Sequence, residues 1–168
     1  IHGLKKDEDG GGLAGALIGL FRADCIEFTT ENAILIATSA EDGSFSFARV
    51  PFGNWIVREI EAPTGFVLSA ETYPVTVDAD GAVIEVEIKN TRIRGTVQLT
   101  KTDRDYPDNK LSGAAFEVYV DTNGNGGLDK DDELLGKMTE VEVGVYQMKE
   151  LLYGKYFVKE TKAPEGYV

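Results

Sequence analysis

Residues 55–66 read Trp-Ile-Val-Arg-Glu-Ile-Glu-Ala-Pro-Thr-Gly-Phe, and residues 156–167 read Tyr-Phe-Val-Lys-Glu-Thr-Lys-Ala-Pro-Glu-Gly-Tyr. Both stretches carry alternating apolar positions, a glutamate in fifth place and a closing Ala-Pro-x-Gly, at an offset of 101 residues. An earlier pair, residues 13–16 and 111–114, matches at an offset of 98. Solenoid repeats are only about 20–50 residues long, whereas this period is the size of a small domain. The sequence therefore predicts two homologous domains in tandem.

Apolar residues alternate with polar ones over short stretches of each unit, for example at residues 45–47, 75–77 and 84–88. This period of two predicts half-buried strands, and the intervening Gly and Pro residues predict tight turns. We expect an all-β chain of two immunoglobulin-like or transthyretin-like β-sandwich domains, at residues 1–92 and 93–168. The counterpart of residues 66–90 would fall largely beyond position 168, so the second domain is expected to lack its C-terminal strands.

The composition of the chain argues against several classes of partner and of catalysis. The 168 residues include 17 Lys and Arg against 29 Asp and Glu, a net charge of −12 that disfavours nucleic acid and anionic membrane surfaces as partners. No apolar run approaches the roughly 18 residues of a membrane span, so no membrane insertion is expected. One histidine, His2, and one cysteine, Cys25, leave no internal disulfide and no basis for His-dependent catalysis. We expect Cys25 to be a small packed side chain.

Three polar side chains of the first domain are predicted to point into its core. Each lies two or four positions from an apolar residue of its own strand, so alternation places it on the inward face: Lys5, Glu59 and Asn90. In the second domain, Lys101 follows Val97 and Leu99 with the same spacing and is predicted to be buried as well.

Burial disfavours the charged forms of lysine and glutamate, which moves the pair towards a neutral amine and a protonated acid. A neutral Lys5 amine is a nucleophile, the Asn90 carboxamide is an electrophile, and Glu59 would carry protons to the departing ammonia. This interpretation predicts a Lys–Asn isopeptide crosslink formed in a single turnover. The alternative is that Lys5 extends to the domain edge and Glu59 forms a plain ion pair.

Residues 156–167, with their copy at 55–66, resemble the conserved glutamate-containing segment of Cna B-type (SpaA-like pilin) domains of Gram-positive surface proteins. The openings Lys5-Lys6-Asp7 and Lys101-Thr102-Asp103, each followed by Leu-x-Gly-Ala, resemble the lysine strand and the next strand of that family. The resemblance implies a transthyretin-like or immunoglobulin-like sandwich that stiffens stalks and pilus shafts, often through an isopeptide bond. It implies that Lys5 and Lys101 are nucleophiles, Glu59 and Glu160 the acids, and Asn90 the acceptor, with no acceptor matched in the second domain.

The acidic loop at residues 121–132 has the spacing of a calcium-binding loop. Oxygen-bearing side chains fall at loop positions 1, 3, 5, 9 and 12, glycine is at position 6, and position 7 would offer a carbonyl: Asp121, Asn123, Asn125, Asp129, Asp132, Gly126 and Gly127. Aspartate at position 12 replaces the usual glutamate, and the flanks are predicted strands rather than helices. The alternative is a solvated hairpin loop, whose Asn and Gly residues provide turn conformations.

We therefore expect a structural stalk or shaft module of a pilus-like protein or adhesin, rigidified by an isopeptide bond in its first domain and located outside the cell on the wall of a Gram-positive bacterium. Its partners would be neighbouring domains of the same surface protein, its signal and anchor would lie outside this chain, and no cofactor besides Ca²⁺ is expected. It would not be a multiple-turnover enzyme. The alternative function is a ligand-binding module that recognises a host protein or glycan.

Overall fold

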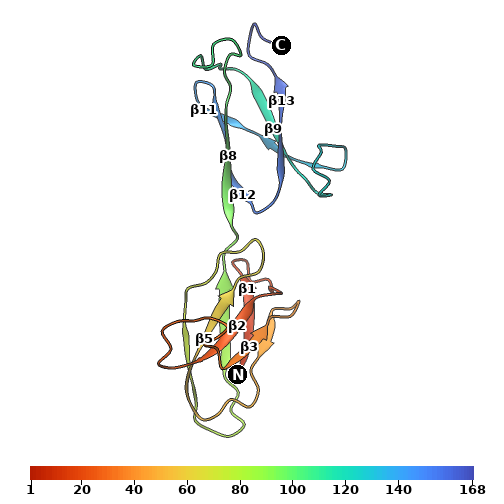
Figure 1. Cartoon of the computed structure of the whole chain (residues 1–168). Helices are drawn as coiled ribbons and strands as arrows, with labels where there is room; N and C mark the ends of the chain where they lie inside the picture. Colours follow the sequence, from red (N-terminus) through yellow and green to blue (C-terminus); the bar gives the residue numbers. More distant parts are fainter. The chain divides into compact units, whose positions relative to one another are not determined.

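The computed structural model of the chain describes residues 1–168, which divide into two compact units, Ile1–Ile93 and Arg94–Val168 (Figure 1). Both units consist of strands and connecting turns and loops, and the secondary structure is all-β as expected. The structure has no helix of the length and apolarity needed to cross a membrane.

Unit 1 is a sandwich of two sheets. One sheet has the order β4-β1-β7 and the other the order β3-β2-β5-β6. The strand bounds are β1 His2–Asp7, β2 Leu17–Arg22, β3 Leu35–Thr38, β4 Ser44–Ser46, β5 Gly53–Glu61, β6 Tyr73–Val77 and β7 Glu85–Asn90. Their alternating inward residues form one apolar core, which includes Ile18, Leu20, Val57 and Ile88, all fully buried. Strand β1 pairs antiparallel with β4 and parallel with β7, so the first and last strands of the unit are neighbours.

Unit 2 is built in the same way from fewer strands. Its sheets have the orders β11-β12-β8 and β10-β9-β13. The bounds are β8 Arg94–Thr100, β9 Ala115–Val120, β10 Glu133–Lys137, β11 Thr139–Glu142, β12 Val145–Leu152 and β13 Tyr156–Lys162. Its buried core cluster is smaller and comprises Phe116, Val118, Met138 and Tyr146.

The strand pairings show how the two units correspond. Strands β8, β9, β10, β12 and β13 repeat the pairings of β1, β2, β3, β4 and β5, whereas β6 and β7 have no counterpart within residues 94–168. The repeat extends to an irregular backbone position, because Arg49 (φ 55°) and Glu150 (φ 60°) both adopt the left-handed region 101 residues apart. Non-glycine residues enter this region rarely, so the backbones of the two units turn in the same way before the strand that carries the glutamate.

A charged cluster ties the end of β1 to the segment after β7 in unit 1. Arg92 contacts Asp7 and Asp9 at 2.6 Å each and Glu8 at 3.4 Å, and its backbone N–H donates to Glu8 Oε2 at 2.7 Å. Asp7 also accepts hydrogen bonds from the backbone N–H groups of Gly11 and Asp9. The Gly11 hydrogen bond and then the Arg92 charge hold the pKa of Asp7 below its usual 3.8 against the effect of burial. This cluster fixes β1 against β7 two residues beyond Asn90.

We predict that Asp7→Asn lowers the thermal stability of unit 1 at pH 7 and reduces its sensitivity to acid. Because the pKa of the Asp7 carboxyl is lower in the folded protein than in the unfolded chain, its contribution is present above the unfolded value and is lost as pH falls through the folded value. Calorimetric Tm values should therefore differ most between wild type and variant at neutral pH, and should converge as pH falls below the unfolded value of 3.8. Asp24→Asn, in an exposed turn after β2, is the control; an equal Tm difference at all pH values would contradict the prediction.

Candidate functional site

The core of unit 1 contains three polar side chains that are nearly inaccessible to solvent. Lys5 on β1, Glu59 on β5 and Asn90 on β7 are 0%, 1% and 2% exposed. Lys5 and Asn90 come from the adjacent parallel strands of one sheet, and Glu59 reaches them from the other sheet across the sandwich. The structure thus brings together the three residues that strand alternation and the family resemblance selected.

The three side chains are in direct contact. Lys5 Nζ donates to Asn90 Oδ1 and lies 3.4 Å from Glu59 Oε1. Asn90 Nδ2 donates to the same Glu59 oxygen at 2.9 Å, so one carboxylate oxygen contacts both the amine and the amide nitrogen. The other oxygen, Glu59 Oε2, accepts from the backbone N–H of Ser69 at 2.8 Å. The carboxylate is therefore held in place on both sides.

Burial controls the charge of the amine. It lowers the pKa of Lys5 from its usual 10.5, and the opposing attraction and hydrogen bond of Glu59 are smaller effects. A lowered pKa increases the fraction of unprotonated amine, which is the nucleophilic form. The apolar surroundings therefore favour the reactive state of Lys5.

The backbone positions this lysine in the same way in both units. Lys5 N donates to Gly43 O at 2.7 Å and Lys5 O accepts from Leu13 N; Lys101 N donates to Gly144 O at 2.8 Å and Lys101 O accepts from Leu111 N. Both glycines have positive φ, and a Cβ on Gly43 would overlap the carbonyl oxygen of Lys5. Only glycine allows this close approach, so the repeated glycine is part of the lysine's placement.

Unit 2 has an incomplete version of the site. Lys101 Nζ lies 2.8 Å from Glu160 Oε2, but these side chains are 25% and 33% exposed, against 0% for both members of the Lys5–Glu59 pair. The prediction that Lys101 is buried is therefore wrong for this structure. The physical reason is that residues 94–168 provide no strand beside β8 equivalent to β7, so the pair is covered less completely than the Lys5–Glu59 pair and no asparagine of this kind lies beside it.

The acidic loop connects β9 to β10 and folds around its own polar groups. Asn125 Nδ2 donates to Asp129 Oδ2 at 2.6 Å, Asp129 N donates to Asp132 Oδ2 at 2.8 Å, and Gly126 N donates to Asp121 Oδ2 at 3.3 Å. Asp121 Oδ1 is buried and has no hydrogen-bond partner. No three Asp, Glu, His or Cys side chains converge to hold a metal by themselves. Cation binding here would consequently use the amide oxygens of Asn123 and Asn125 and the carbonyl of Gly127.

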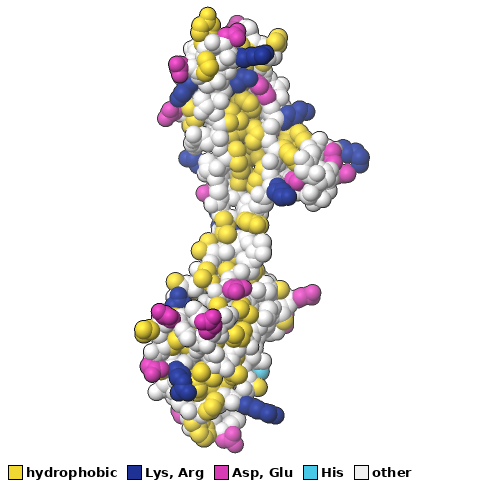
Figure 2. Space-filling view, viewed as in Figure 1, with side chains coloured by type: hydrophobic (Ala, Val, Ile, Leu, Met, Phe, Trp, Pro, Cys, Tyr) yellow, Lys and Arg dark blue, Asp and Glu magenta, His cyan; other side chains and the backbone are white.

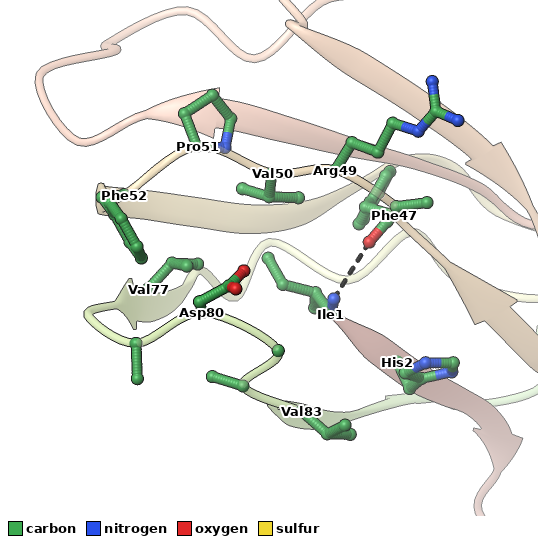
Figure 3. A pocket seen from close by; sticks show the side chains of 14 residues that line it. Ile1, His2, Phe47, Arg49, Val50, Pro51, Phe52, Val77, Asp80 and Val83 are labelled. Carbon is green, nitrogen blue, oxygen red and sulfur yellow. Dashed lines mark hydrogen bonds between the residues drawn. The ribbon is translucent and has the colours of Figure 1, made fainter.

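A surface cavity of about 590 Å³ lies at the N-terminal end of unit 1 (Figure 3). Its lining includes the apolar residues Ile1 and Phe47 and the 50–52 segment, with Arg49 and Asp80 as its charged members. The amino group of Ile1 donates to Phe47 O at 3.0 Å beside it. This cavity is separate from the buried site, because Lys5, Glu59 and Asn90 are absent from its lining. Cys25 lies in the loop after β2, with its thiol 3.2 Å from Glu27 O.

Two parts of the site were not identified from the sequence. Ser69 acts through its backbone N–H, which no side-chain pattern can reveal. The Arg92 cluster joins residues 83 to 85 positions apart. The sequence pointed to it only through the acidic run after Lys6 and the arginine two positions after Asn90.

Comparison with known proteins places these features in a family. The sequence profile described as "SpaA: Prealbumin-like fold domain" matches residues 1–92 and 95–168. No curated protein sequence matches the chain significantly.

Among solved structures, the chain is similar to the Bacillus anthracis TIE protein, with 30% identity, a TM-score of 0.82 and coverage of 99% of this chain and 28% of that one. It also matches a streptococcal ancillary pilin at 22% identity and a TM-score of 0.47, covering 99% of this chain and 54% of that one. The shaft pilin spaA from Lactobacillus rhamnosus GG matches at 15% identity and a TM-score of 0.44, covering 100% and 89%. The chain thus spans little more than a quarter of the length of the TIE protein.

The profile match includes nearly every residue and covers each of the two units separately. The strand pairings of unit 1 are repeated in unit 2 as far as its strands extend. The chain therefore belongs to the SpaA prealbumin-like domain family and contains two tandem members of it.

Proposed function

We propose that the chain is a structural module of a Gram-positive surface fibre or stalk, and that its first unit is closed by an amide bond between Lys5 and Asn90. The observation that carries the proposal is that one buried carboxylate oxygen of Glu59 contacts both Lys5 Nζ and Asn90 Nδ2. Its partners would be neighbouring domains of the same surface protein, and its location would be the outside of the cell wall. Membership in the SpaA prealbumin-like domain family, with similarity to the Bacillus anthracis TIE protein over 99% of the chain, supports this proposal.

The bond would form without another enzyme. The neutral Lys5 amine attacks Cγ of Asn90, a proton passes from the attacking nitrogen to the departing amide nitrogen by way of Glu59, and ammonia leaves as the new C–N bond forms. Glu59 ends in its starting protonation state, so no other reactant is consumed. Reactive groups that the fold holds in the correct orientation reach effective concentrations of about 10⁵ M or more. This proximity offsets the low reactivity of a carboxamide. The reaction occurs once per molecule.

The consequence is mechanical. Lys5 and Asn90 are separated by 85 residues and lie on the adjacent strands β1 and β7. A covalent bond between them prevents these strands from separating when the chain is pulled from its two ends. By analogy with a disulfide that closes a loop of this length, the crosslink should stabilise unit 1 by about 4–5 kcal/mol through the unfolded state.

We predict that the intact wild-type chain is lighter than its sequence mass by one ammonia, and that a proteolytic fragment pair joins Lys5 to Asn90. Glu59→Ala should restore the full mass and lower the Tm of unit 1, because proton transfer is lost. The matched control is Glu61→Ala, on the same strand but exposed, which should keep the mass loss. A wild-type mass equal to the sequence mass would rule out the crosslink, whatever the variants show.

We also propose that the loop at residues 121–132 binds Ca²⁺ and stabilises unit 2. The observation that favours it is the buried, unpartnered oxygen Asp121 Oδ1, because burying a carboxylate oxygen without a partner is costly. The amide oxygens of Asn123 and Asn125, the carbonyl of Gly127 and the carboxylates of Asp129 and Asp132 would complete an oxygen set of the kind that Ca²⁺ prefers. The two asparagine side chains would turn from their present hydrogen bonds with Asp129.

We predict that millimolar Ca²⁺ raises the Tm of unit 2 by mass action and that a chelator reverses the effect. Asp121→Asn should abolish the response, because it removes the negative charge at the first loop position. Asp131→Asn changes the same charge at a loop position outside the oxygen set and should retain the response. If a calorimetric titration with Ca²⁺ gave no heat and the Tm of unit 2 did not change, the calcium proposal would be wrong and the loop would only connect β9 to β10.

A further inference from the structure

The loop at residues 121–132 contains the only asparagines of the chain that are followed by glycine. Asn123 precedes Gly124, and Asn125 precedes Gly126. In such a pair the next backbone nitrogen can approach the side-chain carboxamide closely, because glycine has no Cβ to obstruct it. The loop projects from unit 2 between β9 and β10 in Figure 1, and Figure 2 shows it as a protrusion open to solvent, in agreement with the exposure of residues 122–131.

Three hydrogen bonds surround the carboxamide of Asn125 and the glycine nitrogen next to it. Gly126 N, the nitrogen that would attack, donates to Asp121 Oδ2 at 3.3 Å. Asn125 Oδ1 accepts from Gly127 N at 2.7 Å, and Asn125 Nδ2 donates to Asp129 Oδ2 at 2.6 Å. Every polar atom that changes when Gly126 N attacks Asn125 Cγ therefore has a partner in the loop.

These partners match the changes in charge during such an attack. Asp121 would accept the proton of Gly126 N, and its other oxygen, Oδ1, has no hydrogen-bond partner. The Gly127 N–H would stabilise the negative charge that develops on Asn125 Oδ1, as the donors of an oxyanion hole do. Asp129 holds the carboxamide in one orientation through its Nδ2. The loop thus provides a base, an oxyanion donor and a positioned electrophile.

From these contacts we infer that Asn125 is a self-modification site, at which the chain converts its own carboxamide to a carboxylate. Gly126 N bonds to Asn125 Cγ, the Cγ–Nδ2 bond breaks, and ammonia leaves with the proton of Gly126 N, which passes through Asp121 and solvent. The product is a cyclic succinimide. Water then opens the ring at either of its carbonyl groups, which leaves aspartate or isoaspartate at position 125.

The neighbouring pair Asn123–Gly124 lacks one part of this arrangement. Asn123 Oδ1 accepts from Asn125 N at 3.0 Å, and Asn123 Nδ2 donates to Asp129 Oδ2 at 3.1 Å. No carboxylate accepts a hydrogen bond from Gly124 N, whereas Gly126 N has Asp121. Both pairs have the same sequence and both are exposed. The contact with Asp121 therefore distinguishes the reactive pair from its neighbour.

Calcium would protect the asparagine, a step that rests on the calcium proposal for this loop. Bound Ca²⁺ would take the oxygens of Asp121 and Asn125, so that neither could assist the attack. Conversion adds one negative charge at the fifth loop position, and isoaspartate also lengthens the main chain by one carbon. A calcium-free loop would therefore change with time, whereas a calcium-loaded loop would keep its asparagine.

The test follows the full chain at neutral pH with a chelator, by proteolytic mapping and mass spectrometry over several days. The fragment containing Asn125 should gain the mass difference between OH and NH₂, and should take up heavy oxygen when the water is isotopically labelled. Asn125 should convert about tenfold faster than Asn123, since a positioned base contributes at least this much. A synthetic peptide of residues 121–132, which lacks the fold, should convert both asparagines at similar rates.

Variants of the chain test the role of Asp121. Asp121→Asn should slow the conversion of Asn125 about tenfold, because the proton acceptor is lost, and should leave the rate at Asn123 unchanged. Asp131→Asn is the matched control, because it makes the same change in charge at a loop position that does not contact Gly126 N, and it should keep the wild-type rate. Asn125→Gln should retain its amide, since the same nitrogen would have to close a larger ring.

The outcomes separate this inference from the proposals above. Equal rates at Asn125 and Asn123 in the folded chain, or an unchanged rate in Asp121→Asn, would overturn it. If the rate in millimolar Ca²⁺ equalled the rate in chelator, protection by calcium would be wrong and the modification would stand. The crosslink between Lys5 and Asn90 is read from another fragment pair as a loss of ammonia, so each result can hold without the other.

Discussion

Burial of the Lys5 amine against Glu59 and Asn90 is the constraint on which unit 1 depends. An ammonium in an apolar core is costly unless its partners are placed around it, and these partners come from three strands and both sheets. Strands β1, β5 and β7 must therefore all be in register before the core closes. A shift of one residue in any of them would turn its polar group to solvent and an outward-facing residue into the core.

Comparison of the two units shows which structural features are needed to bury the lysine. They share the lysine, the glutamate, the glycine that accepts the lysine's backbone hydrogen bond, and the left-handed residue before the glutamate strand. They differ in the strand that covers the lysine. With β7 present the side chains of the Lys5–Glu59 pair are fully buried, and without an equivalent strand those of the Lys101–Glu160 pair are 25% and 33% exposed. The same two residue types thus form an enclosed ion pair in one unit and a partly exposed ion pair in the other.

Much of this arrangement could be predicted from residue order. The repeat at an offset of 101 residues predicted two domains, and the alternation of apolar residues predicted strands. The position of each polar residue relative to the apolar residues of its strand placed Lys5, Glu59 and Asn90 on the inward face. The same argument from alternation was wrong for the burial of Lys101. Alternation determines the face of the strand on which a side chain lies, but it cannot show whether a neighbouring strand covers that face. The contribution of Ser69 was also beyond prediction, since a backbone N–H is present at every residue except proline.

The sequence by itself determined the strand pattern, the tandem repeat and the inward faces, because these follow from local alternation and from similarity between distant segments. Tertiary structure alone decided which inward groups touch. One Glu59 oxygen contacts Asn90, 31 positions away, and Lys5, 59 − 5 = 54 positions away, while Lys5 and Asn90 are themselves 85 positions apart. The Arg92 cluster joins segments separated by a similar number of residues. Such contacts depend on how the two sheets pack and on the parallel register of β1 and β7, which no local pattern encodes.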